Sequence, residues 1–98
     1  MSNLGSFNYL YCLTEVAFIY KKDTSTIRKH IKKGIFKVDT DVKKFGKSWV
    51  MTEQAMISIY GSSAFNDYVN NNGKAEYLYS IGAITFKEKI ESELGEIT

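Results

Sequence analysis

The sequence predicts a mainly α-helical protein with one small β-hairpin, followed by a C-terminal extension of mixed α/β structure. Two features support this prediction: two short amphipathic segments lie three residues apart, and a glycine-containing turn then joins two β-prone runs. The 98 residues, 44% hydrophobic and 14% aromatic, suffice for one hydrophobic core. We expect a first domain over residues 1–61 and an extension over residues 62–98 that packs on it.

The first helix is expected over residues 15–20, after a β-prone run at residues 9–13. Thr14 separates the two segments and is a good N-cap residue. Phe18 points away from the apolar face of this helix, so we expect it to pack against the C-terminal extension. The apolar face itself carries Val16, Ile19 and Tyr20.

The second helix is expected over residues 24–33, because Asp23 can cap its start and Gly34 can end it in a left-handed conformation. Ile27 and Ile31 share its inner face. The opposite face is polar and basic, and it carries Ser25, Arg28, Lys29 and Lys32. Two short helices with so tight a connection form a helix-turn-helix.

A hairpin is expected where residues 42–45 and residues 48–51 flank the pair Gly46 and Lys47. Another β-prone run, residues 35–38, precedes it. Basic side chains gather near the tip of the hairpin and make it a basic wing. They are Lys43, Lys44 and Lys47.

A third helix is expected over residues 53–60, with Thr52 as its N-cap and Gly61 after its end. The extension then begins with a short helix over residues 63–69 and a turn over residues 70–73. The apolar stripe of the third helix is formed by Ala55, Met56 and Ile59.

The rest of the extension has two further predicted elements. Alternating residue types over residues 77–81 suggest a strand, although a helical interpretation stays open. Thr85 and Glu88 form a capping box, which predicts a final helix that ends at Gly95. Apolar residues repeat every four positions along it, at Phe86, Ile90 and Leu94.

Charge is unevenly distributed along the chain, although the net charge is only +2. Residues 21–48 contain ten basic and three acidic residues, a net charge of +7, whereas the remainder carries −5. A concentrated basic stripe attracts polyanions, because each neutralised phosphate releases condensed counterions. The alternative is a solvated face that keeps the protein soluble. The position of the lysines on the second helix and the hairpin favours a nucleic-acid partner.

Several classes of function are not expected. Cys12 is the only cysteine and His30 the only histidine, so one chain can form neither a disulfide nor a usual zinc site. No catalytic arrangement, phosphate loop, cofactor site or small-molecule site is evident, so we expect no enzymatic activity. Residues 4–20 are too polar for a membrane span or signal peptide. A reducing, cytoplasmic location fits, with Cys12 as a small buried hydrophobic residue.

Three stretches in this order and spacing resemble the excisionase and MerR-like family of winged helix-turn-helix proteins. They are LTEVAFIY at residues 13–20, DTSTIRKHIKKG at residues 23–34 and GKSWVMT at residues 46–52. The resemblance covers about half of the chain. Lys21 stands where the family often has glycine, His30 where it often has tryptophan, and Thr52 where it often has proline.

The resemblance implies that the second helix enters the major groove of DNA, with its N-terminal residues nearest the bases. Arg28 or Lys29 would reach guanine O6 and N7, and the hairpin lysines would meet the backbone or an adjacent minor groove. Trp49 is expected in the core, and His30 at the edge of the contact with the first helix. The residues expected to contact DNA are Thr24, Ser25, Thr26, Arg28, Lys29, Lys32, Lys33, Lys43, Lys44 and Lys47.

We therefore expect a regulator that binds specific double-stranded DNA, with transcriptional repression as the leading function. One alternative is an excisionase-type accessory factor that bends DNA. Another is an antitoxin or plasmid-maintenance protein that binds a partner through its aromatic-rich extension. A homodimer contact in the extension is a further expectation, because pairing two half-sites adds their contacts.

Overall fold

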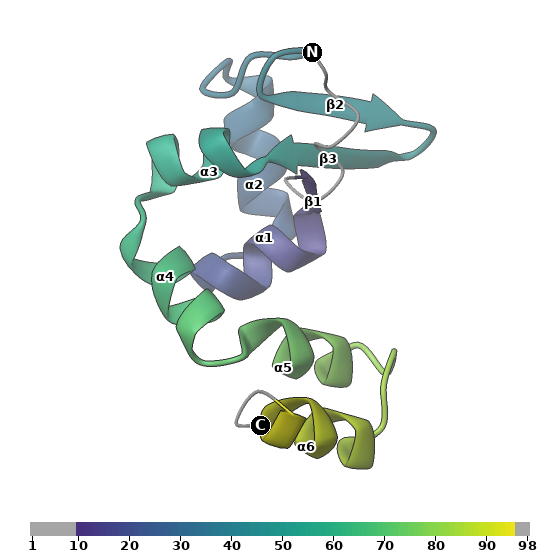
Figure 1. Ribbon diagram of the computed structural model, residues 1–98. Helices are drawn as coiled ribbons and strands as arrows, with labels where there is room; N and C mark the ends of the chain where they lie inside the picture. The colour runs from purple at the N-terminus through teal and green to yellow at the C-terminus, as the bar shows by residue number, and fades with distance from the viewer. Residues whose placement is uncertain (1–9, 96–98) are drawn as a thin grey trace, which may run out of the picture. The chain divides into compact units, whose positions relative to one another are not determined.

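The computed structural model describes residues 10–95, with side chains as far as residue 91. Over that range the chain is mostly helical, with six helices and one three-stranded antiparallel sheet (Figure 1), which confirms the expected mainly helical class with a small β component. The chain divides into two compact units, Met1–Ser62 and Ser63–Thr98. No helix in the described range is long and apolar enough to cross a membrane.

The first unit begins with strand β1, Leu10–Cys12, followed directly by helix α1, Leu13–Tyr20. The prediction that Thr14 caps α1 is wrong, because the extended backbone of Cys12 puts the N-cap two residues earlier. Burial of Leu13 favours this earlier start, since its side chain belongs to the core. Cys12 is exposed rather than buried.

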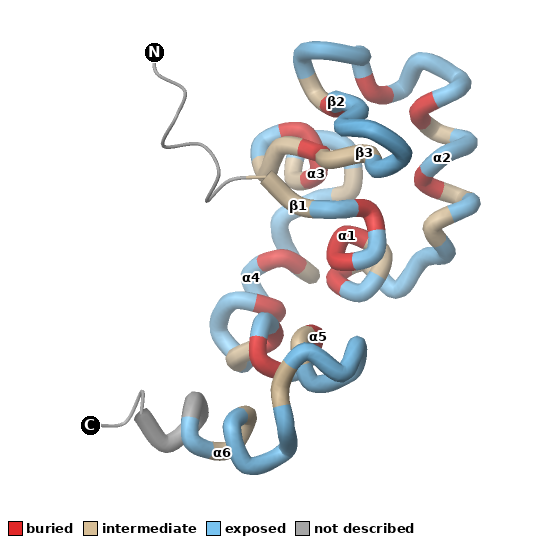
Figure 2. Tube along the Cα trace, turned by 90° about the vertical axis from the view of Figure 1, so that its right-hand side faces the viewer, coloured by how far each residue is buried: buried red, intermediate tan, exposed pale blue. Residues whose placement is uncertain are grey.

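Helix α2, Thr24–Lys32, follows α1 after a three-residue turn. Its end is as predicted: Gly34 has a φ of +82°, its N–H donates to the Ile31 carbonyl over 3.1 Å, and the Ile35 N–H donates to the His30 carbonyl over 3.1 Å. Asp23 occupies the N-cap position, but its side chain makes no capping hydrogen bond. The two buried isoleucines of α2 alternate with exposed positions along the helix (Figure 2).

The turn between α1 and α2 depends on Lys21, which has a left-handed backbone with a φ of 56°. Its N–H donates to the Ala17 carbonyl, and so does that of Lys22, over 3.0 Å. These bonds satisfy the end of α1 and reverse the chain. A side chain at a left-handed position clashes with its own backbone, which explains why glycine suits this site.

Replacing Lys21 by glycine is therefore expected to raise the free energy of unfolding by about 1 kcal/mol. Urea unfolding followed by circular dichroism measures this change. Lys22→Gly is the matched control, because Lys22 is not among the residues with positive φ. Glycine there only increases the freedom of the unfolded chain and should lower stability. A Lys21→Gly variant no more stable than the wild type would contradict the account of this turn.

The expected hairpin is present as strands β2, Val42–Phe45, and β3, Ser48–Thr52, with β3 central in the order β1-β3-β2. Gly46 has a φ of +61° at the first of the two turn positions, where two-residue hairpin turns favour glycine. Met51 pairs with Tyr11 on one side and Val42 on the other. Figure 1 shows the end of this hairpin extending past the helices.

Residues 35–38 do not form a strand, and only Val38 bridges to Val42. A hydrogen-bonded loop takes its place, because the Lys37 carbonyl accepts the N–H of Asp41 over 2.7 Å and that of Val42 over 3.2 Å. The Asp41 carboxylate in turn accepts the Lys37 N–H over 2.9 Å. These N–H and carbonyl groups are therefore paired within the loop, whereas in a strand they would pair with a neighbouring strand.

Helix α3, Glu53–Tyr60, is capped as predicted, since the Thr52 hydroxyl accepts the Ala55 N–H over 3.1 Å. Ile59 is exposed, so the predicted apolar stripe of this helix is only partly buried. Phe18 lies off the core with 37% of its surface exposed, and its contact with the extension stays a prediction. The core of the first unit consists of Leu13, Val16, Ile19, Ile27, Ile31, Phe36, Val42, Met51, Ala55 and Met56.

The second unit is entirely helical over its described residues: α4, Ser63–Asn70, α5, Gly73–Ser80, and α6, Phe86–Gly95. The predicted strand at residues 77–81 is therefore wrong, and so is the α/β character of the extension. Good helix formers stand directly before this segment, at Lys74, Ala75 and Glu76. The helix continues from them because the alternation of residue types that follows is too short to specify a strand.

The capping box of α6 is confirmed by two hydrogen bonds between its partners. The Thr85 N–H donates to Glu88 Oε1 over 2.8 Å, and the Glu88 N–H donates to the Thr85 hydroxyl over 3.1 Å. Phe86 is exposed and Ile90 half-buried, so the predicted stripe is not uniformly covered. The side chain of Leu94 lies outside the described part of the chain.

Candidate nucleic-acid interface

The outward face of α2 is polar, basic and exposed, because Ile27 and Ile31 fix the opposite face in the core. Successive residues turn by about 100° around a helix, which places Lys29 directly opposite these two isoleucines. Arg28 lies instead on a flank, one turn after Thr24. The exposed residues expected to contact DNA in and just after α2 are Ser25, Arg28, Lys29, Lys32 and Lys33, while Thr24 and Thr26 are half-buried.

The three lysines of the hairpin are also exposed, and two of them lie over aromatic rings. The Lys44 ammonium is 5.7 Å from the centre of the Trp49 ring, its cross-strand partner, and the Lys43 ammonium is 5.8 Å from that of Phe45. Contact with a ring limits the motion of a lysine stem while leaving its charge in solvent. The prediction that Trp49 belongs to the core is wrong, since the ring is half-buried and supports Lys44.

A cavity of about 150 Å³ brings the predicted helix and hairpin residues together. Its walls come from the start of α1, the first turns of α2 and the turn between β2 and β3. Arg28 and Lys47, 19 positions apart in the sequence, both line it. The other lining residues are Cys12, Leu13, Thr14, Thr24, Ser48 and Trp49. We name this cavity the α2–hairpin cleft.

The other flank of α2 is held by Tyr60, at the end of α3. The Tyr60 hydroxyl is 2.6 Å from His30 Nδ1, and its ring centre is 5.5 Å from that of Phe36 and 5.2 Å from that of Tyr20. The Lys22 ammonium lies 5.0 Å from the centre of the same ring. Tyr60 therefore joins α3 to α1, to α2 and to the turn after α2, and it supports the orientation of the basic face.

Two tyrosines outside the interface secure the same framework. The Tyr20 hydroxyl donates to the Gly61 carbonyl over 2.8 Å, and the Tyr11 hydroxyl donates to Glu53 over 3.0 Å. Burial raises the pKa of Tyr20 and of Tyr60 above the usual value, and burial together with the hydrogen bond to Glu53 raises the pKa of Tyr11 further. These shifts keep the three hydroxyls protonated at neutral pH and into more alkaline solution.

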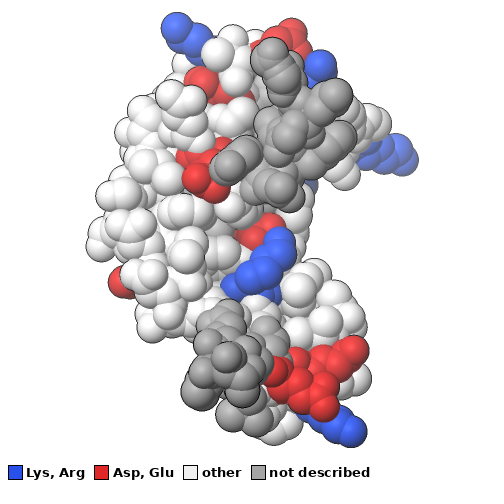
Figure 3. Space-filling view, viewed as in Figure 1, with Lys and Arg blue, Asp and Glu red and all other residues white. Residues whose placement is uncertain are grey.

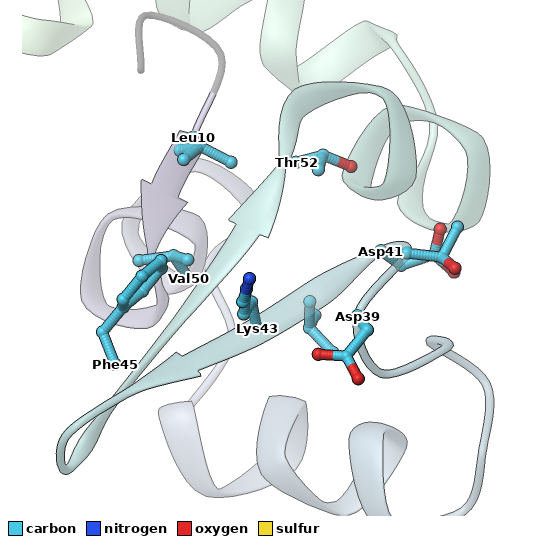
Figure 4. A pocket seen from close by; sticks show the side chains of 9 residues that line it. Leu10, Asp39, Asp41, Lys43, Phe45, Val50 and Thr52 are labelled. Carbon is cyan, nitrogen blue, oxygen red and sulfur yellow. The ribbon is translucent and has the colours of Figure 1, made fainter. Parts of the chain in front are cut away.

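A second cavity, of about 340 Å³, lies on the sheet face that carries Lys43 and Val50. Figure 4 shows Asp39 and Asp41 at one end, Phe45 and Val50 at the other, and Lys43 between them. This cavity therefore combines two carboxylates with one ammonium and an apolar floor. Its charge does not suit a polyanion, in contrast to the α2–hairpin cleft.

The predicted site residues all belong to the first unit. One group of them lies on or just after α2, and the other lies on the hairpin of β2 and β3. The cleft joins the groups through Thr24, Arg28 and Lys47. On the face seen in Figure 3, basic side chains project at the end of the hairpin, and acidic side chains gather on the second unit. Among the residues described, no cluster of His, Cys, Asp or Glu could hold a metal ion.

Sequence reasoning missed the residues that hold α2 from the side. Phe36 falls in a predicted β-prone run and Tyr60 is the last residue of a predicted helix, yet the Tyr60 ring packs against both Phe36 and His30. An aromatic residue directly before a helix-ending glycine, as in Tyr60 and Gly61, was the available signal. Spacing alone gives no indication that its ring reaches a residue thirty positions earlier.

No protein-family model, curated protein or solved structure matches this chain. The resemblance to the excisionase and MerR-like family therefore stays a prediction. The functional assignment rests on the arrangement of α2, the hairpin and the cleft between them.

Proposed function

We propose that this chain is a non-enzymatic protein that binds specific double-stranded DNA and regulates transcription. In this proposal α1 and α2 form a helix-turn-helix, α2 lies in the major groove, and the hairpin of β2 and β3 is a basic wing. The observation that carries the proposal is the α2–hairpin cleft, where Arg28 from the helix and Lys47 from the hairpin turn line one cavity.

The dimensions and polarity of α2 support insertion into DNA. A helix with its side chains is about 10–12 Å across, which matches the major groove of about 12 Å. Ile27 and Ile31 hold one face in the core, and the opposite face presents Ser25 and Lys29. These outermost side chains are the ones placed to reach base edges, where a lysine can donate to guanine O6 and N7.

The remaining basic side chains suit contacts with the DNA backbone. Lys32 and Lys33 lie toward the C-terminal end of α2, whereas the N-terminal residues of such a helix lie nearest the bases. The hairpin lysines carry charge on a short two-stranded ribbon, which can meet the backbone or an adjacent minor groove. Backbone contacts of this kind fix the position of a protein on the duplex but do not read its sequence.

Selection of binding sites from a pool of random duplexes tests this proposal. The full chain is expected to enrich one sequence, and a labelled duplex of that sequence should bind more tightly than a scrambled duplex of the same composition. Enrichment of no sequence, with equal affinity for both duplexes, would contradict sequence-specific binding.

Exposed aromatic residues in the second unit favour a homodimer. The rings of Tyr79 and Phe86 pack edge to face with centres 5.8 Å apart, and Phe86 is still 58% exposed. We propose that this surface contacts a second copy of the chain. An inverted repeat in the selected DNA would support a dimeric repressor, whereas direct repeats would favour monomers side by side, as expected of an excisionase-type DNA-bending factor.

A further inference from the structure

We infer that the α2–hairpin cleft binds one phosphodiester group of the DNA backbone, held between Arg28 and Lys47. This inference rests on the proposed DNA-binding function and makes it more specific. It assigns Arg28 to the backbone, although the sequence alone left Arg28 and Lys29 as equal candidates for reading guanine.

The composition of the cleft indicates an anionic ligand. Arg28 and Lys47 supply two positive charges, and the hydroxyl groups of Thr24 and Ser48 supply further donors, whereas that of Thr14 lies 3.1 Å from the Cys12 sulfur. None of the eight lining residues is acidic. The cavity on the other face of the sheet differs in this respect, because Asp39 and Asp41 line it together with Lys43 (Figure 4).

The size and walls of the cleft suit a phosphodiester. A volume of about 150 Å³ is about ten times the roughly 10–15 Å³ that one water molecule needs on the same measure, so the cleft has room for a phosphate group. Arginine binds phosphate through two parallel N–H donors, and lysine contributes a compact charge. Trp49, which is half-buried, also lines the cleft and adds an apolar residue to its wall.

The helical position of Arg28 separates its role from that of Lys29. Arg28 shares a flank with Thr24, and both residues line the cleft beside the hairpin turn. Lys29 points directly away from the core and does not line the cleft. A phosphate contact by Arg28 fixes the register of α2 on the duplex and leaves base readout to Lys29 and Ser25.

A shared phosphate has a measurable consequence. If Arg28 and Lys47 hold the same group, removal of one weakens the contact of the other, so their effects on affinity are not additive. Arg28 and Lys44 provide the matched comparison, because Lys44 is exposed on the same hairpin but does not line the cleft. The losses of affinity in Arg28→Ala and Lys44→Ala should therefore multiply in the double variant.

The test measures the affinities of Arg28→Ala, Lys47→Ala, Lys44→Ala and the two double variants for the selected and the scrambled duplex. Arg28→Ala is expected to weaken binding to both duplexes equally, by roughly tenfold or more. The Arg28→Ala/Lys47→Ala variant should lose clearly less than the product of the single losses, whereas Arg28→Ala/Lys44→Ala should lose the product. Circular dichroism spectra matching the wild type confirm that each variant is folded.

A second measurement identifies the phosphate. Duplexes in which one linkage at a time is replaced by a neutral methylphosphonate should reveal a position that weakens the wild type but not the Arg28→Ala/Lys47→Ala variant. Titration with inorganic phosphate, followed by amide chemical shifts, distinguishes a free ion from the backbone. The backbone assignment predicts that bound inorganic phosphate is displaced by the selected duplex.

Three results would overturn the inference while leaving DNA binding intact: strictly multiplicative losses for Arg28 and Lys47, a loss in Arg28→Ala confined to the selected duplex, or inorganic phosphate that stays bound beside DNA. Failure of the wild-type chain to bind any duplex would overturn the proposed function and this inference together.

Discussion

Raising the salt concentration from 50 to 200 mM is expected to weaken duplex binding by roughly five hundredfold, because about five DNA phosphates are neutralised. The interface offers seven basic side chains, of which Lys29 reads a base and two others share one phosphate in our account. They are Arg28, Lys29, Lys32, Lys33, Lys43, Lys44 and Lys47. Fluorescence anisotropy of a labelled duplex across this range measures the slope of log affinity against log salt concentration.

Lys87→Ala is the control for the salt experiment, because Lys87 is exposed in the acidic second unit and takes no part in the proposed interface. It should leave the slope unchanged. Lys43→Ala combined with Lys44→Ala should reduce the slope by about 2, since each lysine contributes nearly one released counterion. Binding that hardly responds to salt would show that the basic surface does not face DNA.

Replacing Tyr60 by alanine is expected to lower the free energy of unfolding by about 3 kcal/mol, since truncating a large aromatic residue leaves its neighbours without packing partners. Tyr60 contacts the rings of Tyr20 and Phe36 and hydrogen-bonds His30 of α2. Affinity for DNA should fall as well, because α2 loses the contact that holds one of its flanks. Urea unfolding and duplex titration of the same samples measure the two effects.

Two variants refine this expectation. Tyr60→Phe keeps the ring and removes only the hydroxyl, so it should cost about 1 kcal/mol. Ile59→Ala is the matched control at the neighbouring position, where the side chain is exposed and should contribute less than about 1 kcal/mol. Equal destabilisation by Ile59→Ala and Tyr60→Ala would contradict the role given to Tyr60.

Local signals in the sequence predict much of the first unit, because they act over a few residues. Gly34 and Gly46 take the left-handed conformations that their positions require, and Thr52 caps α3 as its hydroxyl allows. Ile27 and Ile31 give α2 a single buried face, so its basic face follows from helical geometry. These features place most candidate DNA-binding residues on exposed surfaces.

The errors concern contacts between distant parts of the chain. Trp49 resembles a core residue by type and shares a strand face with the buried Met51, but it lies beside the hairpin turn, where its cross-strand neighbour is Lys44. Cys12 is exposed although it belongs to the same small sheet. The strand expected at residues 77–81 rested on five residues, too few to outweigh the helix formers before them.

The cleft itself could not be predicted from the sequence. Arg28 and Lys47 are recognisable as basic residues of a helix and of a turn, but their meeting depends on the angle between hairpin and helix. The chain between α2 and β2 includes a loop closed by hydrogen bonds from residue 37 to residues 41 and 42. No periodic pattern encodes either feature.

We propose that α2 reads DNA sequence while the hairpin supplies affinity. The most direct test compares Lys29→Ala with Lys44→Ala on the selected and the scrambled duplex. Our account predicts that Lys29→Ala loses roughly 1–3 kcal/mol on the selected duplex and little on the scrambled one, whereas Lys44→Ala weakens both alike. If Lys44→Ala changed the preference between the two duplexes and Lys29→Ala did not, the assignment of α2 as the reading element would be wrong.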